Sequence, residues 1–202
     1  KVYENILPDD PAAAEPEYKH IKFLAVDTDC ESFKGLAEDE CLDIHVPNMD
    51  AKMREDTWNK QSPEEFAWLQ PGLDLSDAHY RFGPFVRQEG RYCLFKNIDK
   101  ITERIRELKT EVTTCAGDSK VNVHIITGIT GATGGGTFID MCYIIRDLMG
   151  TDAILFGYFF MPDVNLNKQE IVGNPLSANR IKNNGYAALK ELDYTMNLSK
   201  SG

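Results

Sequence analysis

Apolar runs alternate with amphipathic segments along most of this 202-residue chain. The runs at 21–27, 121–127 and 153–160 have the length and the β-branched or aromatic content of buried strands. Apolar residues at helical spacing predict helices over 91–112 and 138–149. The order β, α, β, α, β predicts a doubly wound, Rossmann-like α/β fold, with a mainly parallel sheet and helices on both faces. The run at 153–160 is therefore expected to be buried on both faces.

The pattern is weaker at the start of the chain and after the first strand. Prolines and acidic residues discourage regular structure near the start, so residues 1–19 are expected to be a connector. Residues 20–202 then form one domain, which carries an irregular insertion at about 30–90. Within this insertion, 41–46 predicts a short strand and 63–69 predicts a helix.

A glycine cluster joins the strand at 121–127 to the helix that follows it. Five glycines within nine positions allow sharp turns, positive φ angles and a concave set of N–H groups at the positive end of a helix. This arrangement binds anions, and phosphate above all. The expected phosphate-binding residues are Gly128, Thr130, Gly131, Ala132, Thr133, Gly134, Gly135, Gly136 and Thr137.

The spacing of these glycines excludes two common phosphate loops. A Walker loop needs a lysine before its final Ser or Thr, but Gly136 is followed directly by Thr137. The dinucleotide pattern fails because Ile139 stands where its third glycine belongs. Two patterns remain. Residues 130–137 resemble the TGxxGxxG of short-chain dehydrogenases except at the last position, and 128–136 resemble the GxGGGTGxG loop of the tubulin/FtsZ superfamily.

The order of four sequence blocks favours the resemblance to the tubulin/FtsZ superfamily. A short-chain dehydrogenase opens with its glycine motif, whereas here a long segment precedes the motif. The four blocks are the strand ending in Asp27-Thr28-Asp29, the pair Gly90-Arg91, the glycine loop, and the strand that closes at Pro162. In amino-acid sequence, the chain is most similar to the bacterial tubulin-like proteins, a branch distinct from cell-division FtsZ.

The resemblance implies an incomplete nucleotide-binding domain of a bacterial, cytoskeletal type. The ligand would be GTP or GDP, and Mg²⁺ is a candidate to bind with it. Copies of the protein would associate head to tail. Asp27, Thr28 and Asp29 could hold a nucleotide hydroxyl or a Mg²⁺-bound water, or could cap the next helix. Asp163 and Asn165 resemble the ribose-contacting loop in position.

The resemblance also bears on activity. The superfamily's first strand and guanine-reading elements are not among these 202 residues, so we expect the chain alone to bind nucleotide weakly and to hydrolyse none. GTPase activity would need a longer, assembled form. No residue is predicted to be catalytic, and the four histidines lack metal-ligand spacing.

Two alternatives of other classes stay open. Tyr186 and Lys190 form the YxxxK of an NAD(P)-binding short-chain dehydrogenase, in which the lysine lowers the pKa of the phenol acid. The stretch between the loop and Tyr186 is short for that fold, and Tyr186 also fits the apolar stripe of a helix predicted over 178–196. The other alternative is a non-catalytic scaffold that has lost nucleotide binding, because the β-carbons of Thr130 and Ala132 would crowd the phosphates.

Composition narrows the partners and the compartment. The net charge of −10 and an isoelectric point near 4.9 would repel nucleic acid and anionic membranes, so neither is expected as a partner. Five cysteines without a CxxC pair suit a reducing cytoplasm. No apolar run approaches the roughly twenty residues of a membrane span. The first residue is Lys1 and not Met, so the chain is expected to begin inside a longer product.

Overall fold

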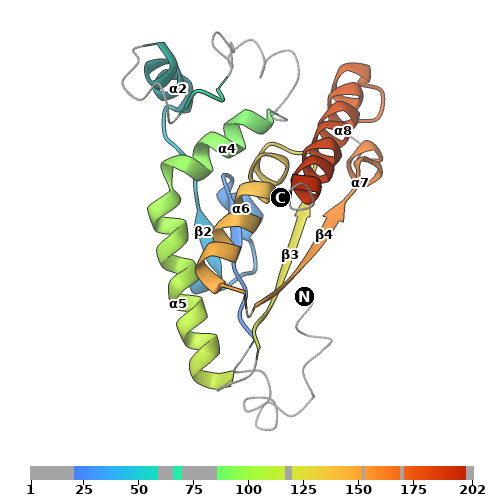
Figure 1. Ribbon diagram of the computed structural model, residues 1–202. Helices are drawn as coiled ribbons and strands as arrows, with labels where there is room; N and C mark the ends of the chain where they lie inside the picture. The colour runs from blue at the N-terminus through green and yellow to red at the C-terminus, as the bar shows by residue number, and fades with distance from the viewer. Residues whose placement is uncertain are drawn as a thin grey trace.

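The computed structural model describes residues 21–58, 66–69, 86–116, 120–151, 153–168 and 171–198. The strands are β1 (Ala25–Asp27), β2 (Cys41–Asp43), β3 (Asn122–Gly128) and β4 (Ile154–Phe160). The helices are α2 (Met49–Trp58), α4 (Arg87–Lys96), α5 (Ile98–Ala116), α6 (Thr133–Met149), α7 (Pro162–Leu166) and α8 (Pro175–Leu198), with short 3-10 helices η2 (Cys30–Phe33) and η3 (Glu38–Glu40). In Figure 1, α4 and α5 lie on one side of α6, and β3, β4, α7 and α8 lie on the other.

Every strand pairing in the described part of the chain is parallel. β1 pairs with β2 from Ala25↔Cys41 onward, and β3 pairs with β4 from Asn122↔Ile154 to Gly128↔Phe160. The predicted α/β fold with parallel strands is confirmed, and the two pairs make small sheets of an incomplete domain. β1 and β2 are shorter than predicted, whereas β3 has the predicted length. β1 begins only at Ala25, and β2 ends where the carboxylate of Asp43 accepts the N–H of His45 at 2.7 Å, a local turn that competes with the ladder.

The helix predicted over 91–112 is two helices that meet at Asn97. The Asn97 side chain donates to the carbonyl of Ile44 at 3.0 Å and to that of Cys93 at 2.8 Å, and its backbone leaves the helical region at φ −115° and ψ 18°. The prediction of one helix was wrong because the apolar spacing continues across this residue. Of the helix predicted over 63–69, residues 66–69 form a turn and the rest lies outside the described residues.

The main hydrophobic core lies under α4 and α5. Tyr92, Leu94 and Ile101 are fully buried there together with Ile44, which follows β2. Tyr92 is a phenol inside this core, and its hydroxyl donates to the Asp56 carboxylate of α2 at 2.7 Å. Burial, reinforced by this hydrogen bond, raises the pKa of Tyr92, so the phenol stays a neutral donor that holds α2 on α4.

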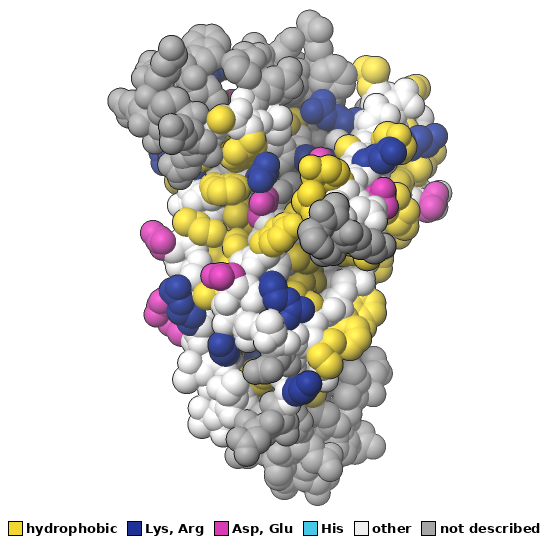
Figure 2. Space-filling view, viewed as in Figure 1, with side chains coloured by type: hydrophobic (Ala, Val, Ile, Leu, Met, Phe, Trp, Pro, Cys, Tyr) yellow, Lys and Arg dark blue, Asp and Glu magenta, His cyan; other side chains and the backbone are white. Residues whose placement is uncertain are grey.

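The outer face of the β3–β4 pair is more exposed than predicted. Hydrophobic side chains on this face reach the surface, and the expectation that 153–160 is buried on both faces was wrong for the described residues. Phe138 of α6 covers the opposite face, where it packs edge-on against Phe159 with ring centroids 5.4 Å apart. Figure 2 shows hydrophobic side chains at the surface along the β4 and α8 side of the molecule. The exposed residues of the outer face are Ile126, Ile154, Phe156, Tyr158 and Phe160.

Two glycines let α4 and the start of α6 touch backbone to backbone. A β-carbon at Gly90 would lie 2.1 Å from the carbonyl oxygen of Ala132. A β-carbon at Gly136 would lie 2.1 Å from the carbonyl oxygen of Arg87 and 2.9 Å from the amide nitrogen of Arg91. All three distances are below a van der Waals contact, so only glycine fits at either position.

Gly136→Ala tests this contact through the sign of its effect. Glycine inside a helix normally costs about 0.5–1 kcal/mol relative to alanine, so the substitution would ordinarily stabilise α6. Here we expect the free energy of unfolding to fall by about 1–3 kcal/mol, because the methyl group meets backbone that cannot yield. Urea denaturation measures the change. Gly131→Ala is the matched control, since a β-carbon there meets nothing within 4 Å, and a Gly136→Ala protein more stable than wild type would refute the close contact.

Candidate functional site

The glycine cluster forms a short turn from β3 into α6. Helix α6 begins at Thr133, so Gly134, Gly135 and Gly136 are already helical. The predicted positive φ angles are wrong, because the positive-φ glycines in the described ranges are Gly35, Gly150 and Gly173. Gly134, Gly135 and Gly136 are instead required by close packing, whereas a β-carbon at Gly128 or Gly131 would meet nothing within 4 Å. A β-carbon at Gly134 would lie 2.4 Å from both the carbonyl oxygen of Gly128 and the hydroxyl of Thr127.

The start of α6 offers backbone donors. Ala132, the residue before the first turn, makes no side-chain cap. The first N–H groups of a helix have no acceptor within it, and they lie at the positive end of the helix dipole. Gly131 faces open space next to them. This end of α6 therefore has the polarity and the room that an anion needs.

The end of β1 meets the first residue of α6. The hydroxyl of Thr133 donates to the Asp27 carboxylate at 2.9 Å, and the N–H of Thr28 donates to the same oxygen at 2.7 Å. The two threonine hydroxyls lie 3.0 Å apart. Three residues predicted from separate parts of the sequence are thus brought together. Asp29 is not among them, because its exposed carboxylate accepts the N–H of Glu31 at 3.0 Å and so caps η2.

Thr130 anchors the loop from inside. It is fully buried, its hydroxyl accepts the side-chain N–H of Asn165 at 2.5 Å, and its carbonyl accepts that of Asn184 at 2.9 Å. The expectation that its β-carbon crowds a phosphate surface was wrong, because the side chain points into the protein. Gly185 lies against the same residue, since a β-carbon there would approach the methyl group of Thr130 to 3.3 Å.

The remaining predicted residues lie at the margin of the loop. The Thr137 hydroxyl donates to the carbonyl of Thr133 at 2.8 Å, and Thr137 is buried within α6. Asp163 is exposed on α7, where its backbone carbonyl accepts the side-chain N–H of Asn167 at 3.0 Å. In the ranges that the structure describes, no group of His, Cys, Asp and Glu is arranged to hold a metal ion.

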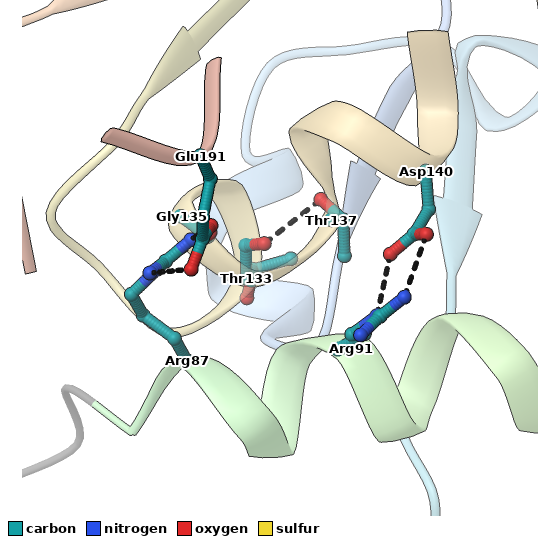
Figure 3. Close-up of polar contacts among 7 residues, drawn as sticks. All are labelled: Arg87, Arg91, Thr133, Gly135, Thr137, Asp140 and Glu191. Atoms are coloured by element: carbon teal, nitrogen blue, oxygen red, sulfur yellow. Dashed lines mark hydrogen bonds and ion pairs between the residues drawn. The ribbon is translucent and has the colours of Figure 1, made fainter. Parts of the chain in front are cut away.

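Two arginines of α4 contact the same region, and the sequence analysis noted only one of them, Arg91. The Nε of Arg87 donates to the carbonyl of Gly135 at 2.8 Å, and its terminal nitrogens pair with the carboxylate of Glu191 (Figure 3). Arg91 binds Asp140 through two hydrogen bonds of 2.7 and 3.0 Å. All four side chains line a pocket of about 570 Å³ between α4, α6 and α8. The only signal in the sequence was Gly90-Arg91, and it did not indicate these partners.

The dehydrogenase motif lies on the outside of α8. Tyr186 is 66% exposed, so the expectation that it belongs to the apolar stripe of the helix was wrong. Ile181 and Ala188 of the same helix are buried, and Leu189 is exposed. The Lys190 nitrogen lies 5.9 Å from the centroid of the Tyr186 ring. Both side chains are exposed to solvent.

Parallel strands, covering helices and a glycine-rich turn at the carboxyl end of a strand define a Rossmann-like α/β protein. Within that class, the model of the family described as "Tubulin like" matches residues 12–201. The chain therefore belongs to the tubulin-like family, as the order of its sequence blocks indicated. Neither curated proteins nor solved structures gave a match. Among the described helices, none combines the length and the apolar character that crossing a membrane requires.

Asn184→Ala tests the inner anchor of the loop. Removing its amide leaves the buried carbonyl of Thr130 without this donor, so we expect a loss of about 1–3 kcal/mol in the free energy of unfolding. Asn183→Ala is the matched control on the next position of α8, where the side chain is exposed, and it should change stability by less than about 0.5 kcal/mol. Thermal unfolding of both variants measures the difference. Equal effects would show that the contact with Thr130 contributes nothing.

Proposed function

We propose that this chain is part of a tubulin-like GTP-binding protein, with the phosphates of GTP or GDP held by the loop 128–137. The observation that carries the proposal is the uncapped start of α6 beside the carboxyl ends of β1 and β3. Ligands of parallel α/β proteins bind at this edge of the sheet. Membership of the tubulin-like family supports guanine nucleotide as the ligand.

The residues of the loop have two roles in this proposal, and Gly134 has both. The backbone amides from Gly131 to Gly135 face the phosphates, and the Thr133 hydroxyl, oriented by Asp27, adds a side-chain donor. Thr130, Gly134 and Gly136 give the loop its shape from inside. An acidic protein can bind phosphate in this way because the donors are local backbone dipoles, which do not depend on net charge.

Self-association and compartment are part of the same proposal. Membership of the tubulin-like family supports head-to-tail assembly. The exposed apolar face of β3 and β4 supports contact with another protein surface. All five cysteines are free, which suits the reducing cytoplasm of a bacterial cell. The exposure of Tyr186 and Lys190 to solvent does not favour the hypothesis of a short-chain dehydrogenase.

Gly131→Glu and Gly131→Gln test the phosphate site without disturbing the fold. Neither side chain meets protein atoms at its β-carbon, so both variants should unfold like wild type. The carboxylate of Gly131→Glu would face the phosphates, and we expect it to lower GTP affinity about tenfold or more, beyond any steric effect seen with glutamine. Equilibrium dialysis measures binding, with NADPH as a competitor. Preferential binding of NADPH, or equal GTP affinity of all three proteins, would contradict the proposal.

The 202-residue chain is expected to release no phosphate from GTP on its own. The Asp27 carboxylate lies beside the loop, and its Oδ1 accepts the Thr133 hydroxyl and the Thr28 N–H, so we assign it a structural role and no catalytic one. A phosphate-release assay at several protein concentrations tests this. Stoichiometric turnover that does not depend on protein concentration would show that the chain carries its own catalytic group.

A further inference from the structure

Arg87 and Arg91 form two matched ion pairs one helical turn apart on α4. Each arginine pairs with a carboxylate on another helix, Arg87 with Glu191 of α8 and Arg91 with Asp140 of α6. The pairs differ in their further contacts. The Arg91 guanidinium lies over the ring of Trp68, 4.6 Å from its centroid, whereas Figure 3 shows Arg87 in contact with the loop. The Arg87 Nε also donates to the backbone carbonyl of Gly135, at 2.8 Å, whereas Arg91 contacts the side chain of Asp140, one turn further along α6. Arg87 is thus the arginine in contact with the glycine loop.

The two partners of this pair are held very differently. The Arg87 side chain is only 16% exposed and is fixed by Gly135, while the side chain of Glu191 is 50% exposed and borders an open pocket. Removing the Glu191 charge would therefore leave Arg87 in place. Because water screens the half-exposed carboxylate of Glu191, the pair contributes less to stability than a fully buried pair would.

The position of Arg87 matters because of what the loop lacks. The loop contains no lysine, and the chain carries a net charge of −10. A partly buried guanidinium against the first turn of α6 adds positive potential where phosphate would bind, and interactions at such a site are screened less than at the surface. The Glu191 carboxylate offsets that potential from the other side.

We propose that Arg87 is a positioning residue that sets the anion affinity of the glycine loop, and that Glu191 restrains this affinity. The inference rests on the proposed function and adds a regulatory pair to it. Any change that draws Glu191 away from Arg87, including a movement of α8, strengthens phosphate binding. A purely structural bridge between α4 and α8 behaves differently, because breaking it from either end would weaken the loop.

The test compares GTP dissociation constants of wild type, Glu191→Gln, Arg87→Gln and the control Asp140→Asn. At low salt we expect Glu191→Gln to bind GTP about threefold or more tightly than wild type, and Arg87→Gln about threefold or more weakly. Asp140→Asn breaks the matched pair that does not touch Gly135, so it should stay within about twofold. The gain in Glu191→Gln should shrink in about 0.5 M salt, where the Debye length falls to a few ångströms.

The outcomes separate this inference from the function on which it rests. Wild type that binds no GTP overturns both. Wild type that binds GTP, with Glu191→Gln binding equally or more weakly, overturns the role of Arg87 and Glu191 alone. Thermal unfolding of each variant accompanies the measurement, and the sign of the Glu191→Gln effect decides the matter even where Arg87→Gln fails to fold.

Discussion

The backbone contact between α4 and the start of α6 is the constraint on which the rest of the site depends. Gly90 and Gly136 bring the two helices together so closely that a β-carbon on either would lie 2.1 Å from a carbonyl oxygen of the other segment. This contact fixes the direction in which α6 leaves β3. It also places Arg87 and Arg91 along α6, where one reaches the carbonyl of Gly135 and the other reaches Asp140.

A second set of contacts holds the loop from the opposite side. Asn165 of α7 and Asn184 of α8 both donate to Thr130, which is completely buried, and their two hydrogen bonds satisfy its hydroxyl and its carbonyl. Buried polar groups need such partners, and a fully paired set specifies a single arrangement. The loop is therefore shaped by α4, α7 and α8 together, while its outer surface stays open at Gly131.

The sequence predicted the α/β class, the parallel strands and the position of the loop, because these depend on local patterns of apolar residues and glycines. It did not predict why the glycines are needed, since close packing between α4 and α6 joins residues far apart in the chain. The break at Asn97 was missed for the same reason, because its side chain bonds to the distant Ile44. The contacts of Asn184 with Thr130 and of Glu191 with Arg87 also join distant segments, so local patterns did not indicate them.

The backbone angles of the loop explain why its two departures from the superfamily pattern are tolerated. Thr130 and Ala132 stand where that pattern has glycine, and a glycine is indispensable only at positive φ or at a close approach. Asn48 is the non-glycine residue with positive φ in the described ranges, so neither substitution strains the backbone. The Thr130 side chain instead gains a buried hydrogen bond with Asn165. Thr130 therefore supports the loop from inside and leaves its outer surface open at Gly131.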